Sequence, residues 1–184
     1  NIAKPYWKKK HICLVDEKYS TRAQDNGYYF FKHCMDHDEE TYLGQKIYYV
    51  ITKDSPDYDM IRPYKKNVVH FMTIRHMCYI LAAELLVSTD ARSHIYAQRS
   101  RHSIFTRYTK KLPFVFLQHG VTALKRVDFF YGNGKPGSCD LFVVTSEKEK
   151  QIVIDNFNYE PDEVINTGFA RWDVLKDKSQ DSHD

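Results

Sequence analysis

Short apolar segments alternate with longer polar or amphipathic segments along most of this chain. The apolar segments are rich in β-branched and aromatic residues, which favours extended strands over helices. The segments that predict strands are 11–15, 46–52, 67–71, 85–89, 113–118, 140–145 and 163–168. Polar turns bound most of these segments, as expected for strands that each cross one sheet.

The intervening segments carry helical spacing. Tyr28, Phe31 and Met35 recur at intervals that place them on one helix face, which we expect to be core, and residues 25–27 suit the start of that helix. Further helices are predicted at 55–64 (closed by Pro63), at 73–84 and at 147–157, whereas 102–111 is ambiguous.

Strands that alternate with helices imply right-handed crossovers and a mainly parallel sheet with helices on both faces. We therefore predict an α/β fold of the Rossmann-like kind, and the chain length favours one domain. No GxGxxG pattern follows the first predicted strand, so the usual dinucleotide fingerprint is missing.

Composition narrows the function classes. The 184 residues are 42% hydrophobic and carry a formal net charge of +3, which is far below the charge of a dedicated nucleic-acid binder. We expect no nucleic-acid partner. Lysine and arginine cluster at 8–10, 65–66, 99–101, 110–111 and 125–126. These clusters fit either a solvated surface or attraction to anionic lipid or a polyanionic substrate.

Cysteine and histidine spacing gives no sign of a cofactor. The four cysteines are far apart, and the nine histidines show no metal-ligand spacing. We expect a reducing, cytoplasmic compartment, no disulfide framework, no metal and no other cofactor. The longest apolar stretch, 77–87, contains Glu84 and is too short to cross a bilayer. No signal-peptide pattern is visible, and a start at Asn1 suggests a portion of a longer protein.

The segment from Pro113 to Asp173 carries the sharpest chemical signal. A core strand breaks abruptly into His119-Gly120, and in open α/β sheets ligands bind outside such strand ends. An imidazole, whose ordinary pKa is about 6.5, suits proton transfer at neutral pH. The alternative for His119 is a histidine that only bonds backbone at a strand end.

Several neighbours of His119 could contact phosphate oxygens, and each also has a structural interpretation. Thr122, Lys125 and Arg126 could bind phosphate, or they could line an exposed helix start. Gly120 could let the backbone approach a phosphate or adopt a positive φ, or it could simply end the strand.

Two residues at predicted helix starts are candidates of a second kind. Asn26 lies after the first strand, where it could contact a ligand at the cleft or serve the helix cap. Ser146, with Glu149 three residues later, forms a capping-box pattern and could also contact the cleft.

Five segments together resemble the CDP-glycerol glycerophosphotransferase family, the teichoic-acid and capsule polymerases and primases of Gram-positive bacteria. The segments are DNGYYFFKH, SPDY, FLQHGVTALKR, DLFVVTSEKEK and INTGFARWDVL, in the order and spacing typical of that family. The resemblance extends from about Lys10 to Lys176. Many members carry a threonine-proline pair after His-Gly, where this chain has Val121-Thr122-Ala123, although the following lysine is kept as Lys125.

The resemblance implies a fold, an activity and partners. Members resemble two-domain GT-B enzymes that transfer glycerol phosphate or ribitol phosphate from a CDP-alditol to a hydroxyl of a lipid-linked polymer at the inner face of the cell membrane. Residues 1–176 would be the amino-terminal Rossmann-like domain, and 177–184 a disordered tail or the start of an interdomain linker. His119 would be the general base. Arg171 and Asp173 would match a motif near the interdomain crossing, where they could shape the hinge, and a buried or surface ion pair explains them equally well.

Two other functions fit the same residues. One is a GT-B glycosyltransferase that uses a nucleotide sugar, because a fold alone does not determine chemistry. The other is an anion-binding or acceptor-binding module that is not catalytic in isolation.

Overall fold

The computed structural model describes residues 10–37, 41–42, 44–97, 102–122 and 126–175. Their strands form one twisted sheet in the order β2-β3-β1-β5-β6-β7-β8, with β4 also beside β3. Only the β2–β3 pair is antiparallel. The strands are β1 Ile12–Asp16, β2 Thr41–Tyr42, β3 Gln45–Ile51, β4 Val68–His70, β5 Ala83–Ser88, β6 Phe114–Phe116, β7 Leu141–Val144 and β8 Val164–Asn166.

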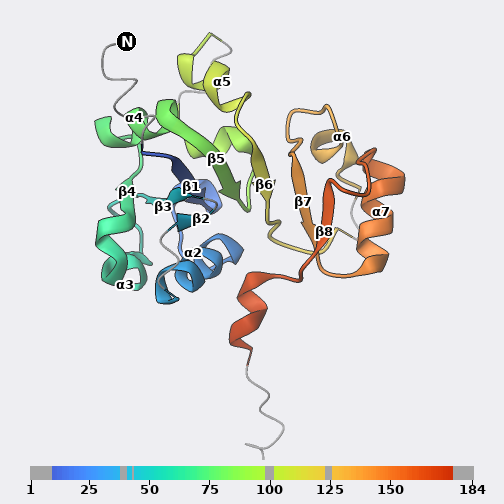
Figure 1. Ribbon diagram of the computed structural model, residues 1–184, viewed down its shortest axis with the longest axis horizontal. Helices are drawn as coiled ribbons and strands as arrows, with labels where there is room; N and C mark the ends of the chain where they lie inside the picture. The colour runs from blue at the N-terminus through green and yellow to red at the C-terminus, as the bar shows by residue number, and fades with distance from the viewer. Residues whose placement is uncertain (1–9, 38–40, 43, 98–101, 123–125, 176–184) are drawn as a thin grey trace, which may run out of the picture.

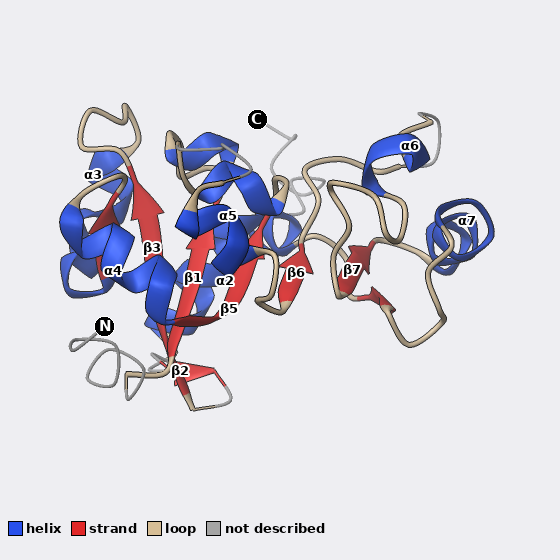
Figure 2. Cartoon of the chain, turned by 90° about the horizontal axis from the view of Figure 1, so that it is seen from above, coloured by secondary structure: helices blue, strands red, loops and turns tan. Residues whose placement is uncertain are grey.

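Helices cover both faces of this sheet (Figures 1 and 2). The α-helices are α2 Asn26–Asp36, α3 Tyr58–Ile61, α4 Ile74–Ala82, α5 Ile104–Thr109, α6 Asp128–Tyr131 and α7 Glu147–Phe157. The 3-10 helices are η1 Lys18–Ser20, η2 Arg62–Asn67, η3 Arg92–Ile95 and η4 Ala170–Val174. The predicted Rossmann-like α/β fold, with a mainly parallel sheet and helices on both faces, is confirmed.

Alternate residues of the central strands build two separate cores. Ile12 and Leu14 pack on one face with residues of α4, α5 and α7, whereas Cys13 and Val15 pack on the other face with α2 and η2 neighbours. Side chains of a strand point alternately to opposite faces, so a continuous apolar strand serves both cores. The aromatic face of α2 is core, as predicted, because Phe31 is fully buried there.

Two predicted elements differ from the structure in detail. The helix predicted at 55–64 is not closed by Pro63. Instead α3 ends at Ile61, and Pro63 lies at the start of η2, where a missing N–H is tolerated. The ambiguous segment 102–111 contains α5, whose first turn is capped by the Ser103 hydroxyl. In the described part of the chain, no helix is long and apolar enough to cross a membrane.

Candidate functional site

The chain turns sharply at the end of β6 and presents His119 to solvent. Gln118 has a φ of 56°, a left-handed conformation that non-glycine residues adopt at a cost. Its buried side chain holds the turn, because Nε2 donates to the Val143 carbonyl at 2.6 Å on the neighbouring strand. His119 and Gly120 follow at once and are exposed.

One hydrogen bond determines which nitrogen of His119 is available for chemistry. Nδ1 lies 3.0 Å from the carbonyl oxygen of Thr89, at the end of β5. A carbonyl only accepts, so Nδ1 carries the proton and, in the neutral ring, Nε2 keeps its lone pair. A ring oriented in this way can accept a proton at Nε2.

Asn26 joins the start of α2 to the His119 turn. Its side-chain Nδ2 donates to the carbonyls of Leu117 at 3.2 Å and Gln118 at 2.9 Å. β6 ends at Phe116, so these two carbonyls find a side chain in place of the sheet ladder. Asp25, one residue earlier, caps α2 by accepting from the Asn26 N–H.

Arg171 ties η4 to the same turn from the far end of the sequence. Its backbone N–H donates to Asn26 Oδ1 at 3.2 Å, and its guanidinium donates to the His119 carbonyl at 3.1 Å. The guanidinium also pairs with the buried Asp25 carboxylate, which Lys18 approaches at 2.9 Å. Three predicted site residues, Asn26, His119 and Arg171, therefore meet from distant parts of the chain.

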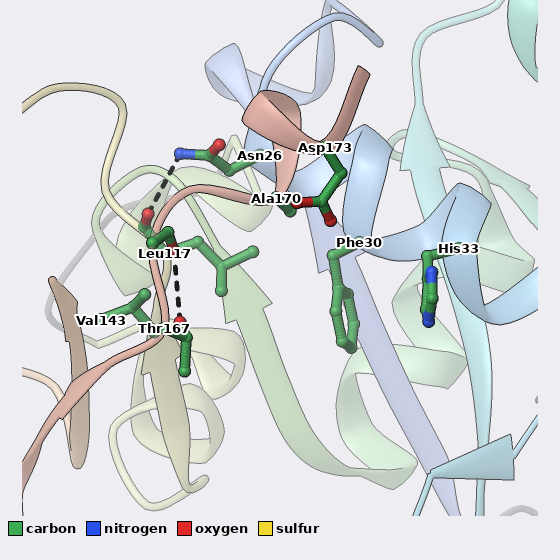
Figure 3. Close-up of a pocket in the computed structure, with 9 residues that line it drawn as sticks. Asn26, Phe30, His33, Leu117, Val143, Thr167, Ala170 and Asp173 are labelled. Carbon is green, nitrogen blue, oxygen red and sulfur yellow. Dashed lines mark hydrogen bonds between the residues drawn. The ribbon is translucent and has the colours of Figure 1, made fainter. Parts of the chain in front are cut away.

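A hollow of about 230 Å³ lies beside this meeting point. Its lining residues include Asn26, Leu117 and Asp173, and Figure 3 shows Phe30 and His33 of α2 along one side. Asp173, predicted from the same motif as Arg171, extends from η4 toward the hollow (Figure 3). His119 is not among the residues that line it.

Glu149 anchors the loop after His119, and the sequence did not reveal this role. Oε1 accepts from the Thr122 N–H at 2.7 Å and lies 2.9 Å from its hydroxyl, while Oε2 accepts from the Thr145 N–H at 2.8 Å. Burial acts to raise the pKa of Glu149, but hydrogen bonds from Thr122 and Thr145 outweigh it and lower that pKa. The carboxylate is therefore ionised and buried.

The capping-box pattern was half right. Ser146 Oγ accepts from the Glu149 N–H at 3.2 Å, so Ser146 caps α7. The Glu149 carboxylate, in contrast, turns to Thr122 and Thr145. The sequence signal for Glu149 was a glutamate three residues after a capping serine. That spacing predicts a bond within the helix start, not a bond to a distant loop.

The remaining predicted residues lie apart from the turn or are already bonded. Both polar groups of Thr122 contact Glu149, and its hydroxyl also lies 2.6 Å from Gln118 Oε1. The Arg126 side chain is 93% exposed, and its Nε lies 3.6 Å from the Asp128 carboxylate. Gly120 has no positive φ, contrary to one expectation, because Gln118 takes that conformation instead. Lys125 lies outside the described residues.

Acidic residues at the ends of β1 and β5 form a second group that sequence reasoning missed. Burial raises the pKa of Asp16 and of Glu17 to about 7 each. Glu17 accepts from the N–H groups of three residues at the start of α2. The sequence signal for this group was the presence of carboxylates directly after a predicted strand. Among the described residues, no group of three or more His, Cys, Asp or Glu could hold a metal ion.

A family model and two kinds of relative match this chain. The model described as CDP-Glycerol:Poly(glycerophosphate) glycerophosphotransferase matches residues 2–184. The minor teichoic acid biosynthesis protein GgaB of Bacillus subtilis (strain 168) is 30% identical over 174 residues, which are 94% of this chain and 18% of GgaB.

Solved structures of the wall teichoic acid polymerase TagF share the fold. One TagF structure has a TM-score of 0.58 at 12% identity and covers 94% of this chain and 42% of TagF. A TagF variant soaked with CDPG gives a TM-score of 0.59 at 13% identity, with the same coverage. This chain thus spans less than half of the relatives it matches. It belongs to the CDP-glycerol:poly(glycerophosphate) glycerophosphotransferase family.

Proposed function

We propose that the protein containing this chain transfers an alditol phosphate, glycerol phosphate or ribitol phosphate, from a CDP-alditol to a hydroxyl of a lipid-linked polymer. The observation that carries the proposal is the His119 ring, held through Nδ1 by the Thr89 carbonyl and exposed at the carboxyl end of the sheet. Family membership supports the reaction class.

The reaction needs one proton transfer and one displacement at phosphorus. His119 Nε2 takes the proton of the acceptor hydroxyl as its oxygen attacks the β-phosphorus of the donor. The new bond joins the acceptor oxygen to that phosphorus, and the bond to the CMP oxygen breaks, so CMP leaves. General bases of this kind contribute about 10²–10⁴-fold to rate.

The other candidate residues take supporting roles in this proposal. Gly120 leaves open space above its backbone, where a phosphate could approach, because a Cβ added there would meet no atom within 4 Å. Lys125 and Arg126 would supply positive charge to phosphate oxygens, whereas Thr122, Asn26, Ser146 and Arg171 would hold the turn and its neighbours. Asp173 would face the donor side through the hollow that it lines.

The domain arrangement is part of the proposal. Residues 1–176 would be the amino-terminal half of a GT-B unit, with 177–184 leading toward the other half, and a second half would supply donor contacts. Its partners would be the CDP-alditol, the lipid-linked polymer and the cytoplasmic membrane surface, where the enzyme would act as a peripheral protein. These assignments rest on the family and on the TagF fold likeness.

The decisive experiment replaces His119 in the full-length protein. We expect His119→Ala to lower turnover of CDP-glycerol or CDP-ribitol by about 100-fold or more. His37→Ala is the matched control, because His37 is also exposed and its Nδ1 also lies near a carbonyl, that of His33 at 2.9 Å. Its turnover should stay within about twofold of wild type.

Two results would contradict the proposal. If His119→Ala keeps wild-type turnover, His119 is not the general base. Consumption of a nucleotide sugar in place of both CDP-alditols, measured with radiolabelled donors, would instead identify a glycosyltransferase.

A further inference from the structure

β1 and β5 are neighbours at the point where the strand order of the sheet reverses. From β1 the chain builds β3 and β4 on one side, and it then returns to place β5 on the other side of β1. The last residues of the two strands, Asp16 and Ser88, are register partners. Ligands of open α/β sheets bind outside the strands at such a switch point.

A strained turn follows β1 at this point. Lys18, Tyr19 and Ser20 have φ values of 47°, 58° and 59°, so three successive residues with side chains are left-handed. Such residues cost roughly 1–2 kcal/mol each relative to ordinary conformations. Strain of this kind clusters at functional sites and persists only where surrounding contacts enforce it.

The contacts that enforce the turn are specific. The Tyr19 N–H donates to Asp90 Oδ2 at 2.8 Å, and the Ser20 hydroxyl donates to Asp16 Oδ2 at 3.3 Å. The Thr52 N–H donates to the Ser20 carbonyl at 2.8 Å. The turn is therefore held in a conformation that presents the Tyr19 side chain outward, where the residue is 50% exposed.

The Tyr19 ring forms a flat wall together with His94. The two rings stack with centroids 4.1 Å apart and planes 20° apart. Stacking leaves the outer face of each ring uncovered by the other, and the negative π face of a ring attracts partly positive hydrogens, such as those bound to the carbons of a polyol.

Asp90 lies next to Tyr19 and His94, and its carboxylate is largely buried. Its side chain is 10% exposed, and Oδ2 lies 3.8 Å from His94 Nδ1. Although burial acts to raise it, the pKa of Asp90 is lowered by His94, by the Tyr19 N–H and by His119. Oδ2 accepts from the Tyr19 N–H at 2.8 Å, and the carboxylate has further lone pairs with which it can accept a hydrogen bond from a ligand.

Unpartnered polar atoms concentrate behind Asp90. Asp16 Oδ1 and Thr89 Oγ1 are buried and have no hydrogen-bond partner among the described residues. Buried polar groups are nearly always hydrogen-bonded, and an unmet one costs free energy. Asp16 and Thr89 are almost completely buried, at 1% and 0% exposure. Unmet polar groups at a switch point mark the strand ends around Asp90 as a polar region rather than as apolar core.

The charge of the cluster limits what that ligand is. Asp90 repels a phosphate, and Lys18, next to Tyr19 in the strained turn, is already paired with Asp25. Carboxylate oxygens accept from hydroxyl donors instead. Thr89 links the cluster to the base, because its carbonyl holds His119 Nδ1.

We propose that Tyr19, Asp90 and His94 form the subsite for the hydroxyl-bearing terminal unit of the acceptor and deliver one of its hydroxyls to His119. The proposal rests on the proposed transferase function and adds to it the side of His119 on which the neutral end of the acceptor binds. The charged donor would approach from another side.

The test uses steady-state kinetics of the full-length protein with a synthetic glycerol phosphate oligomer that ends in a free hydroxyl. Tyr19→Asn removes the ring but keeps a residue that tolerates a left-handed conformation. We expect Tyr19→Asn and Asp90→Asn each to raise the KM for the oligomer about tenfold or more, the loss expected for one hydrogen bond to a charged group, with the donor KM within about twofold. Tyr58→Asn, which removes the Tyr58–His70 ring stack beyond β3, should change neither constant.

The outcomes separate this subsite from the proposed function. An unchanged oligomer KM in both variants, or an equal rise in the donor KM, overturns the subsite while transfer by wild type persists. If wild type transfers no alditol phosphate at all, the function fails, and calorimetric binding of the oligomer to His119→Ala with and without Asp90→Asn decides the subsite alone. If Tyr19→Asn does not fold, Tyr19→Phe should keep and Asp90→Asn should lose oligomer affinity, and equal affinities overturn the proposal.

Discussion

Gln118 bears the conformational strain of presenting His119. A left-handed residue with a side chain is unfavourable by about 1 kcal/mol or more, and the loss is offset where that side chain is itself bonded in the core. Here Nε2 reaches the Val143 carbonyl, and Oε1 lies close to the Thr122 hydroxyl. A glycine at 118 would adopt the left-handed conformation without strain but would lose both side-chain contacts. These contacts, rather than backbone freedom, therefore determine the geometry of the turn.

Asp16 gives a pH-dependence prediction at the same scale. Its pKa is raised from an ordinary value of 3.8 to about 7, mainly by burial. The folded state therefore holds a proton that the unfolded chain has lost, and stability is present at acidic pH and lost as pH rises through about 7. We expect Asp16→Asn, which mimics the protonated form, to reduce the fall in unfolding free energy between pH 5 and pH 8 by roughly 2–4 kcal/mol, measured by urea denaturation.

The matched control for that experiment is Asp155→Asn. Asp155 is exposed on α7 and accepts from Gln151. Its variant should follow the wild-type pH dependence, since Glu17 and Asp16 remain. Parallel curves for wild type and Asp16→Asn would contradict the assignment of the proton to Asp16.

At the scale of elements, α7 serves the His119 loop as much as it serves the core. Glu149 in its first turn bonds Thr122 through one oxygen and Thr145 through the other. A glutamine has one oxygen and one amide nitrogen, so it can satisfy only one of these two N–H groups. The helix start is thus chemically matched to a carboxylate.

Glu149→Gln should therefore destabilise the protein by about 2 kcal/mol or more and lower transfer activity in the full-length enzyme. Glu147→Gln is the control, because Glu147 lies in the same turn but is exposed and bonds Asn166. Both variants remove one negative charge from the helix start, so only their difference reports the loop. Equal unfolding free energies in urea would show that the loop does not depend on Glu149.

The sequence predicted the elements well where a periodic pattern was long or a strand was continuously apolar. The helix at 147–157 matches α7 at both ends, because a capping serine and a regular pattern define it. All seven predicted strands exist within a few residues. The four-residue helix α6 and the two-residue strand β2 were missed, since so few residues carry no period.

The candidate site was predictable only in part. His119, Asn26 and Arg171 were identified by motif and by position at strand and helix ends, and the structure brings them together. Glu149 and Asp90 were not identified as site residues, because their partners are distant in sequence. A single carboxylate in a sequence is usually interpreted as a surface residue. The left-handed turn at Lys18–Ser20 carries no glycine that would signal it.

At the scale of the whole molecule, the sheet order places the main described candidates at the carboxyl end of the sheet. The carboxyl ends of β1, β5 and β6 supply Asp16, Asp90 and His119 in turn, and η4 returns to the same edge (Figure 1). Because this site lies at the end of one sheet, residues outside that sheet would hold the donor, as in the proposed two-half arrangement.

This arrangement predicts the behaviour of the chain by itself. We expect the 184-residue chain to release no CMP from CDP-glycerol or CDP-ribitol, whereas the full-length protein does so in the same assay. Circular dichroism of the isolated chain is the control, because an unfolded chain would be inactive for another reason. CMP release by the folded isolated chain would show that one half holds all the catalytic groups.

The two hydrogen bonds from the Asn26 amide have a consequence for chemical ageing. An asparagine followed by glycine, as Asn26 is by Gly27, is the pair most prone to spontaneous loss of its side-chain nitrogen. Deamidation there would place a negative oxygen against the carbonyls of Leu117 and Gln118, where a donor now lies. A stored sample could thus lose the shape of its reactive edge without any break in the chain.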